Sequence, residues 1–223
     1  EVNPVQLPSG IWSCFPEASR SVAYDSIAAP YDWLVGNTLY NRIAWGGWSD
    51  CYSGAAREAI RQTENSNAAI LDCGCGTLKF TAEAYKSGPL ERMKLFDSSI
   101  AMMARGKKRL PGGYFVQGDA LDTPFVDKSF GFVLSWGLLH LFGSNSQLLP
   151  EFYRVMQDGG KLFLSVLVKG ERGMGDIMLN QLHKRGEISE PESRSQYEQS
   201  VGRYFRIDRS YLSGSMLFIS ASK

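Results

Sequence analysis

The stretch AILDCGCGTLKF, residues Ala69 to Phe80, places an apolar run directly before a turn that contains two cysteines and two glycines. A helix-competent stretch, Lys79 to Ser87, follows the turn. An apolar run that ends in glycines and continues into a helical pattern predicts a strand, a tight turn and a helix. Such a turn can belong to a metal site, to a redox pair, or to a loop that holds a nucleotide-like ligand.

The cysteine spacing argues against the first two kinds of site. Cys73 and Cys75 are separated by one residue, whereas zinc sites and redox pairs favour C-x-x-C. Cys14 and Cys51 lie in a different region, and the chain has two histidines. We therefore expect no metal, and we interpret Cys73 and Cys75 as small residues beside a glycine turn. Four cysteines in this pattern are a poor disulfide framework, which predicts a reducing, cytoplasmic setting.

A turn for a dinucleotide is the third possibility. Gly74 and Gly76 supply the first two glycines of G-x-G-x-x-G, but Lys79 occupies the third position. Asp72 stands immediately before the turn, where a carboxylate would face the phosphates of a dinucleotide. That charge disfavours a dianionic ligand and favours one that carries an ammonium and a sulfonium.

The rest of the chain alternates strands with helices, which predicts an α/β fold with a doubly wound, mostly parallel sheet. The expected strands are residues 68–73, 90–96, 114–117, 129–136, 161–168, 204–212 and 216–220, the last two forming a C-terminal antiparallel hairpin. The expected helices are residues 79–87, 98–110, 148–157 and 174–185. The polar stretch GEISEPESRSQ, residues 186–196, is interpreted as a loop. These elements predict a seven-stranded sheet.

The segment AILDCGCGTLKFTAEA resembles the first motif of class I S-adenosylmethionine-dependent methyltransferases, commonly hydrophobic-hydrophobic-D-x-G-C-G-T-G. Asp97 follows Gly76 by about twenty residues, as the ribose-binding acid of a doubly wound fold does. GDALDTPFVDKSFGFVLSWGLLHLF, residues 118–142, and EFYRVMQDGGKLFLSV, residues 151–166, are similar to later blocks of the family. The resemblance is close over residues 66–168 and looser over the terminal hairpin.

Two positions depart from the family pattern. Leu78 stands where the family often has glycine, and Gly131 stands where it commonly carries a structural Asp. We expect the first to narrow the turn and the second to cause a local change without loss of cofactor binding. Either departure is also compatible with a relative that no longer transfers methyl groups.

The resemblance implies S-adenosylmethionine as the cofactor and assigns a set of residues to it. The assigned residues are Tyr24, Tyr31, Asp72, Gly74, Cys75, Gly76, Asp97, Ser98, Met102, Asp119, Ala120, Leu121 and Ser135. Asp72 would orient the turn or meet the amino group, and Asp97 would accept the ribose hydroxyls. Asp119, with the backbone of Ala120 and Leu121, would meet the adenine. The alternatives are a helix-capping Asp72, a turn aspartate at Asp119 and a core methionine at Met102.

The first fifty residues contain four of the five tryptophans. YDSIAAPYDWL, residues 24–34, and LYNRIAW, residues 39–45, resemble the leading helices of ubiquinone/menaquinone-type methyltransferases. The resemblance implies an N-terminal helical lid over residues 1–60, with Tyr24 or Tyr31 reaching the cofactor carboxylate. The cofactor domain would span residues 61–223, with a helical insertion around residues 169–200. The alternative is that the aromatic residues only anchor the segment to the sheet.

His140, in GLLHLF, follows the fourth strand and is the candidate general base, because its pKa range suits proton transfer near neutral pH. A structural histidine is the alternative. The predicted function is methyl transfer to O, N, S or C of a small apolar or aromatic metabolite. The alternatives are a cofactor-binding relative without methyl transfer and an RNA or protein methyltransferase.

Composition narrows the partners. The 223 residues carry a net charge of +1, so no global field favours nucleic acid or a membrane surface, and no apolar run suffices to span a bilayer. The basic cluster Arg105 to Arg109 is interpreted as a complement to a helix dipole. A small-molecule substrate is the expected partner, and the sequence leaves the oligomeric state open.

Overall fold

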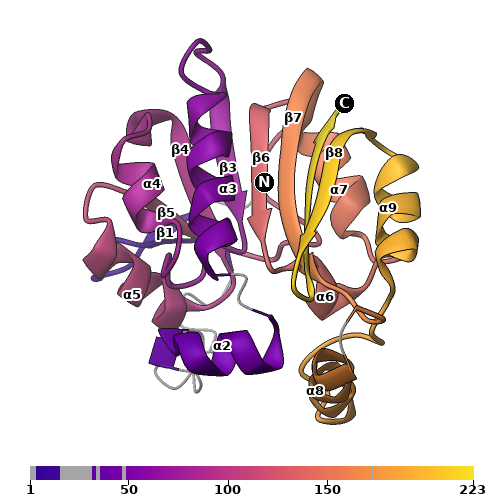
Figure 1. Cartoon of the computed structure of the whole chain (residues 1–223). Coiled ribbons are helices and arrows are strands. Elements are labelled where there is room, and N and C mark those ends of the chain that lie inside the picture. The colour runs from indigo at the N-terminus through magenta and orange to yellow at the C-terminus, as the bar shows by residue number, and fades with distance from the viewer. Residues whose placement is uncertain (1–3, 16–31, 34–35, 47–48, 172) are drawn as a thin grey trace.

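The computed structural model describes residues 4–15, 32–33, 36–46, 49–171 and 173–223, and its centre is a nine-stranded sheet (Figure 1). The strand order is β1-β2-β5-β4-β3-β6-β7-β9-β8. The strands are β1 Val5–Gln6, β2 Trp12–Ser13, β3 Ala69–Cys73, β4 Met93–Asp97, β5 Tyr114–Gln117, β6 Phe130–Trp136, β7 Met156–Leu167, β8 Arg206–Ser213 and β9 Met216–Ser222. The pairs among β5, β4, β3, β6 and β7 are parallel, and β9 pairs antiparallel with β7 and β8. The predicted α/β class and the C-terminal hairpin are confirmed.

The predicted strand count of seven is wrong, because two short strands of the N-terminal segment extend the sheet. β2 pairs parallel with β5, and β1 pairs antiparallel with β2. The buried Ser13 hydroxyl donates to Gln117 Oε1 at 2.7 Å, which ties β2 to the sheet edge. Strands of two residues show no hydrophobic periodicity, so the sequence does not predict them. They form because the edge of β5 offers unpaired backbone groups.

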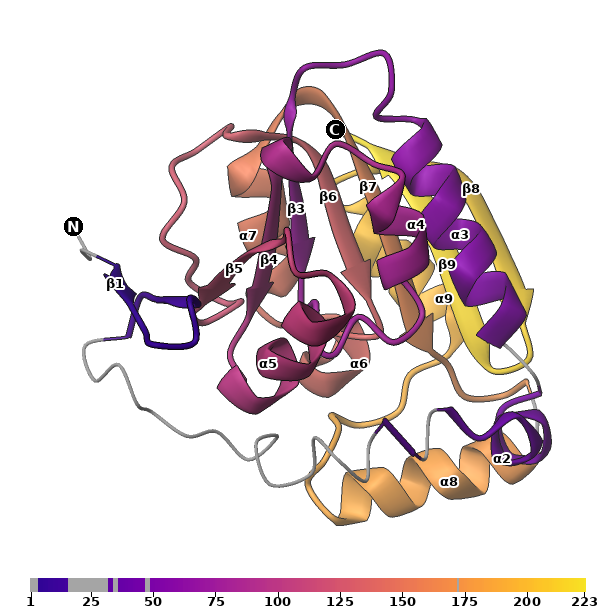
Figure 2. The ribbon, with the colours of Figure 1, turned by 90° about the vertical axis from the view of Figure 1, so that its left-hand side faces the viewer.

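Helices cover both faces of the sheet (Figure 2). They are α2 Thr38–Ala44, α3 Ser49–Arg61, α4 Ala82–Lys86, α5 Ile100–Arg109, α6 Leu139–Phe142, α7 Leu148–Val155, α8 Gly173–Lys184 and α9 Arg194–Gly202. One core cluster joins α3, α4 and α5 to the sheet, and a second joins α7 and α9 to the opposite face. None of the described helices combines the length and the apolar character needed to cross a membrane.

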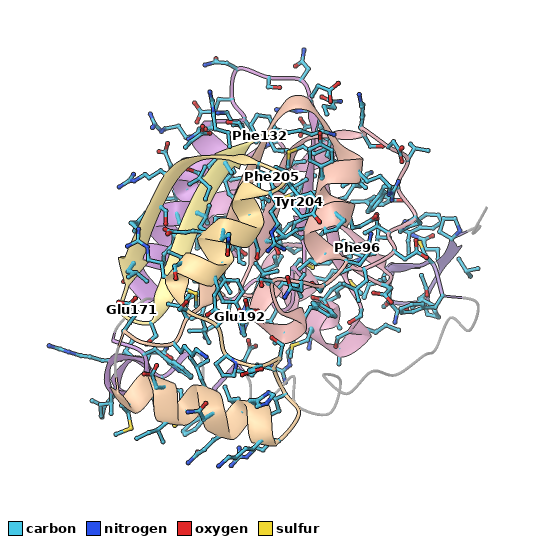
Figure 3. All side chains as sticks on the ribbon, turned by 90° about the vertical axis from the view of Figure 1, so that its right-hand side faces the viewer. Phe96, Phe132, Glu171, Glu192, Tyr204 and Phe205 are labelled. Carbon is cyan, nitrogen blue, oxygen red and sulfur yellow. The ribbon has the colours of Figure 1, made fainter. Side chains whose placement is uncertain are left out.

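α9 lies partly in the stretch that was expected to be a loop, so that expectation is wrong. Ser193 caps the helix, and the Gln196 side chain accepts from the Ser193 backbone N–H at 2.8 Å. The sequence contains the signal for this capping box, Ser193 followed three residues later by Gln196. The polar composition of the helix nevertheless favours a loop, which is why the helix was not predicted. Phe205, just after α9, is buried and lies 5.8 Å from the ring of Tyr153 on α7 (Figure 3).

Leu78 adopts the left-handed backbone conformation, with φ +54°. This conformation costs a non-glycine residue about 1–2 kcal/mol. The Leu78 side chain is only 2% exposed and belongs to the core cluster under α3, α4 and α5. Burying a leucine contributes about 1.5–3 kcal/mol, which offsets the backbone cost. A glycine at this position would relieve the strain but lose that burial.

Gly131 is explained by a close contact at the start of β6. A Cβ at Gly131 would lie 2.4 Å from Cβ of Ala68, so no side chain fits without movement. The contact lies near the amino end of β6, whereas the glycine turn follows the carboxyl end of β3. The departure at Gly131 is therefore a local packing change, as the sequence predicted.

We expect Gly131→Ala to destabilise the protein by about 1–3 kcal/mol, because the added methyl group overpacks the contact with Ala68. Chemical denaturation measures the free energy of unfolding. Gly202→Ala in α9 is the matched control, since a Cβ there meets nothing within 4 Å. The double variant Gly131→Ala, Ala68→Gly should recover most of the lost stability. If Gly131→Ala alone is as stable as wild type, the close contact with Ala68 does not exclude a side chain at this position.

Candidate functional site

A cavity of about 300 Å³ opens where β3, β4 and β6 end. We call it the strand-end cavity. It gathers residues from the first motif, from the end of β4 and from the loop after β6. Its lining consists of Gly74, Gly76, Asp97, Ser98, Met102, Trp136, Gly137, Leu138, Leu141, Phe142, Gly186 and Glu187. Ligand crevices of open α/β sheets lie at the carboxyl ends of the strands. Five of the residues predicted from the sequence therefore share one crevice.

The glycine turn is held against the end of β4 by its own backbone. The N–H groups of Gly74 and Cys75 donate to the Phe96 carbonyl at 2.8 and 3.0 Å. Gly74 has φ +80° and Gly76 has φ +53°, which glycine adopts without steric cost. A Cβ at Gly74 would lie 3.0 Å from the Leu138 side chain, whereas a Cβ at Gly76 would meet nothing within 4 Å. The Leu138 side chain thus leaves no room for a side chain at Gly74, and the positive φ favours glycine at both positions.

Asp97 closes the turn from the side of β4. Its Oδ2 accepts from the Gly76 N–H at 2.8 Å, and its Oδ1 accepts from the Ser99 N–H at 2.8 Å. The carboxylate is half-buried and lines the strand-end cavity. A carboxylate offers about four acceptor positions, so it can receive further donors from a ligand. Ser99 caps α5, because its side-chain oxygen accepts from the Met102 N–H at 3.1 Å.

Asp72 lies behind the turn and not in the lining of the cavity. It is fully buried, and its Oδ2 accepts from the Tyr85 hydroxyl at 2.9 Å. The Trp136 Nε1–H donates in turn to the Tyr85 oxygen at 2.8 Å. The Asp72 Oδ1 finds no hydrogen-bond donor among the described residues. Burial, with a smaller contribution from Asp97, raises the pKa of Asp72 to about 7, although the Tyr85 hydrogen bond opposes the shift.

We expect Asp72→Asn to change the pH dependence of stability. The carboxyl ionises near pH 3.8 when exposed and near pH 7 when folded, so its stabilising contribution is complete below pH 3.8 and is lost as the pH rises to 7. A shift of about three pKa units corresponds to ~4 kcal/mol. The free energy of unfolding of wild type should fall by that order relative to the variant between pH 4 and 7. Denaturation at several pH values measures this dependence, and Asp122→Asn, at an exposed position, is the control. If the free energies of unfolding of wild type and Asp72→Asn change with pH in parallel, the prediction is wrong.

Tyr85 joins Asp72 to Trp136, so Tyr85→Phe should leave two buried polar groups with one partner fewer each. We expect a loss of about 1–3 kcal/mol per unsatisfied group, measured by chemical denaturation. The pKa of Asp72 should rise further, since the Tyr85 bond lowers it. Tyr153→Phe, at a half-exposed tyrosine on α7, is the control. Unchanged stability would show that the chain of bonds does not hold the site together.

Other predicted residues lie away from the strand-end cavity. Asp119 is exposed, and its Oδ1 accepts from the Leu121 N–H at 2.9 Å, which shapes its own turn. Ala120 and Leu121 are half-buried against the core under α7 and α9. Ser135 is buried and its hydroxyl finds no partner among the described residues. Cys75 lines an adjoining cavity of about 50 Å³.

Tyr24 and Tyr31 lie outside the described residues. The lid predicted for residues 1–60 is therefore described only in part. That part contains the helices α2 and α3 but also the strands β1 and β2. The four cysteines are all free thiols, and burial raises the pKa of Cys73 and Cys75 well above the ordinary thiol value.

His140 does not line the strand-end cavity. Its Nδ1 accepts from the Leu167 N–H at 3.5 Å, and its carbonyl accepts from the Ser189 N–H at 3.1 Å. Burial lowers the pKa of His140 to about 4, so the ring is neutral at pH 7 and a weak base. The contacts give His140 a place between β7 and the segment after α8.

The basic cluster of α5 does more than complement a helix dipole. Arg109 donates to Asp32 Oδ2 and to the Thr77 carbonyl, both at 2.6 Å. The Thr77 hydroxyl donates to Asp32 Oδ1 at 2.6 Å. Asp32 is only 7% exposed, so its carboxylate is largely shielded from water. The cluster therefore fixes a residue of the N-terminal segment to the glycine turn.

The cavity contains residues that the motif did not identify. Trp136 is the last residue of β6, and Leu138, Leu141 and Phe142 follow it. Their place at the carboxyl end of that strand is the signal that could have found them. Glu187 comes from the segment after α8, where no motif points to a site. Glu192, which also follows α8, accepts from the Ser144 N–H at 2.8 Å and joins this segment to the residues after α6 (Figure 3).

Known proteins share the sequence pattern of this site. Residues 71–164 match the family model described as "Methyltransferase domain". A demethylmenaquinone methyltransferase from Corynebacterium kroppenstedtii is 33% identical over 147 residues, which cover 64% of this chain and 58% of that protein. The chain thus spans somewhat more than half the length of this curated relative.

Solved structures show the same fold. A methyltransferase in complex with the Haloferax volcanii Trm112 activator has a TM-score of 0.68 at 16% identity, covering 92% of this chain and 99% of that one. The [4+2]-cyclase SpnF also has a TM-score of 0.68, at 15% identity, covering 90% of this chain and 93% of that one. At these identities the likeness concerns the fold. The resemblance to methyltransferases that the motif predicts is confirmed.

Proposed function

Starting from the methyltransferase domain at residues 71–164, we propose that this chain binds S-adenosylmethionine and transfers its methyl group to a small apolar or aromatic metabolite. The observation that carries the proposal is the strand-end cavity, which brings Gly74, Gly76 and Asp97 together. The menaquinone-type relative supports a small organic acceptor. The cofactor supplies an electrophilic methyl group on a sulfonium.

The residues of the cavity fit this cofactor. The open space beside Gly76 supports a place for the methionyl part, and the Asp97 carboxylate in the same lining would accept the ribose hydroxyls. Ser98 and Met102 line the same cavity and would contact the rest of the cofactor. The buried Oδ1 of Asp72, which finds no donor among the described residues, is an acceptor close behind the turn, and an ammonium group nearby would favour the ionised form of this carboxyl.

The predicted adenine contacts of Asp119, Ala120 and Leu121 stay part of the proposal. They follow β5, which is hydrogen-bonded to β4 beside Asp97. Tyr24 and Tyr31 remain candidates for the cofactor carboxylate. His140 acts in this proposal as a positioning residue, because it reaches Leu167 and the segment after α8 and not the cavity.

Methyl transfer is an in-line displacement, so the chain must mainly hold the acceptor at attack distance and exclude water. The apolar part of the lining, Trp136, Leu138, Leu141 and Phe142, is suited to exclude water. Glu187 is the acidic group on the insertion side of the same cavity. A cationic sulfonium is also attracted by the face of an aromatic ring such as Trp136.

Calorimetric titration with S-adenosylmethionine and S-adenosylhomocysteine tests the cofactor. We expect micromolar binding by wild type and about tenfold to hundredfold weaker binding by Asp97→Asn, because hydrogen bonds to a charged group contribute about 1.5–3 kcal/mol. Asp122→Asn, at an exposed position of a neighbouring turn, should bind as wild type does. Absence of binding by folded wild type would contradict the proposal.

A screen of phenols, quinols and thiols as acceptors then separates two functions. Turnover that disappears in Asp97→Asn supports a methyltransferase. Cofactor binding without any methyl transfer would instead favour a relative that uses the cofactor site for regulation or for another reaction.

A further inference from the structure

A second cavity, of about 460 Å³, lies between α3 and the strands β7, β9 and β8. We call it the α3 groove. Figure 2 shows α3 in front of the β8–β9 hairpin. The groove is bounded by Gly54 and Glu58 of α3, Trp136 of β6, Phe163 of β7, Tyr211 of β8 and Phe218 of β9. Trp136 also lines the strand-end cavity, so the two cavities share a wall.

The groove exists because α3 presents small residues to the hairpin. Cys51, Gly54 and Ala55 face the cavity, and Glu58 and Gln62 continue the same side of the helix. A Cβ at Gly54 would meet nothing within 4 Å, and its φ is not positive. Neither packing nor backbone conformation therefore requires glycine here, although glycine in a helix interior lowers stability. The missing side chain keeps the groove open.

The floor of the groove is aromatic. The rings of Tyr211 and Phe218 are stacked, with centroids 5.2 Å apart and an interplanar angle of 12°. Tyr52 links this pair to the cofactor side, since its ring lies 6.0 Å from Phe218 and 5.8 Å from Trp136. Aromatic side chains favour stacked or edge-on contact with another ring. The shape and lining fit a planar aromatic ligand.

The mouth of the groove carries a cation, Arg209, whose side chain is exposed. Arg209 lies over the ring of Tyr211, at 4.8 Å, and forms no ion pair within 4.0 Å with the residues that the structure describes. Glu58 binds Gln62 at 3.0 Å and Arg61 at 2.8 Å. These two hydrogen bonds, with a smaller attraction from Arg209, hold the pKa of Glu58 below its ordinary value, so Glu58 compensates Arg209 only in part. Arginine recognises carboxylates through paired donors, so an acidic group is the complement of this mouth.

We propose that the α3 groove binds a planar aromatic acid, with its ring between Gly54 and the Tyr211–Phe218 stack and its carboxylate at Arg209. This site goes beyond the proposed function, because it is separate from the cofactor turn and its ligand binds without the cofactor. Its common wall with the strand-end cavity, Trp136, places the ligand next to the site of methyl transfer.

Titration calorimetry with 2-naphthoate, in the absence of S-adenosylmethionine, tests the groove. Gly54→Met fills the open space from the helix and should weaken binding at least tenfold without lowering the thermal midpoint. Gly202→Met is the matched control on α9, where a Cβ also meets nothing within 4 Å, and it should bind as wild type does. Equal affinities of Gly54→Met and wild type, or no binding of 2-naphthoate by wild type, would overturn the proposal.

The uncharged analogue 2-naphthamide tests the role of the charge. Wild type should bind 2-naphthoate about two- to fivefold more tightly than 2-naphthamide, which is the scale of an exposed ion pair. Arg209→Gln should remove this preference and leave binding of the amide unchanged. A preference that persists in Arg209→Gln would overturn the assignment of the carboxylate to Arg209. Because no arm of this experiment uses the cofactor, its outcome is independent of the proposed function.

Discussion

The structure of the site depends on one short set of hydrogen bonds between the glycine turn and the end of β4. Gly74 and Cys75 donate to the Phe96 carbonyl, and Gly76 donates to the Asp97 carboxylate. These bonds bind two parallel strands together beyond their last ladder pair, Cys73 with Phe96. They also set the position of the acid that faces the cavity. A side chain at Gly74 would collide with Leu138, so the same turn determines how closely the loop after β6 approaches.

A second chain of bonds supports this turn from behind. Trp136 donates to Tyr85 and Tyr85 donates to Asp72, which joins the ends of β6 and β3 to α4. An unpaired buried carboxylate is costly in a medium of low polarity, and here the pKa of Asp72 rises toward neutrality to reduce that cost. Trp136, at the end of this series of hydrogen bonds, lines both the strand-end cavity and the α3 groove. A movement of the Trp136 indole would therefore change the shape of both cavities.

The two departures from the family pattern have different physical reasons, and neither removes a residue from the strand-end cavity. Leu78 accepts an unfavourable backbone conformation because its side chain fills the core under α3, α4 and α5. Gly131 lies against Ala68 at the start of β6, where a side chain does not fit. The arginines of α5 add a third local feature, since they hold Asp32 against Thr77 beside the turn.

The sequence by itself determined the parts that depend on local pattern. Apolar runs that end in glycine or aspartate located β3, β4 and β6, and spacing from the first motif located Gly74, Gly76 and Asp97. The tertiary structure alone decided the rest, because it depends on contacts between distant segments. β2 exists only beside β5, Glu187 reaches the cavity from the far side of α8, and Asp72 turns toward Tyr85 instead of the lining. The α3 groove also needs a helix and a hairpin that lie some 150 residues apart in the chain, which no periodicity within either element reveals.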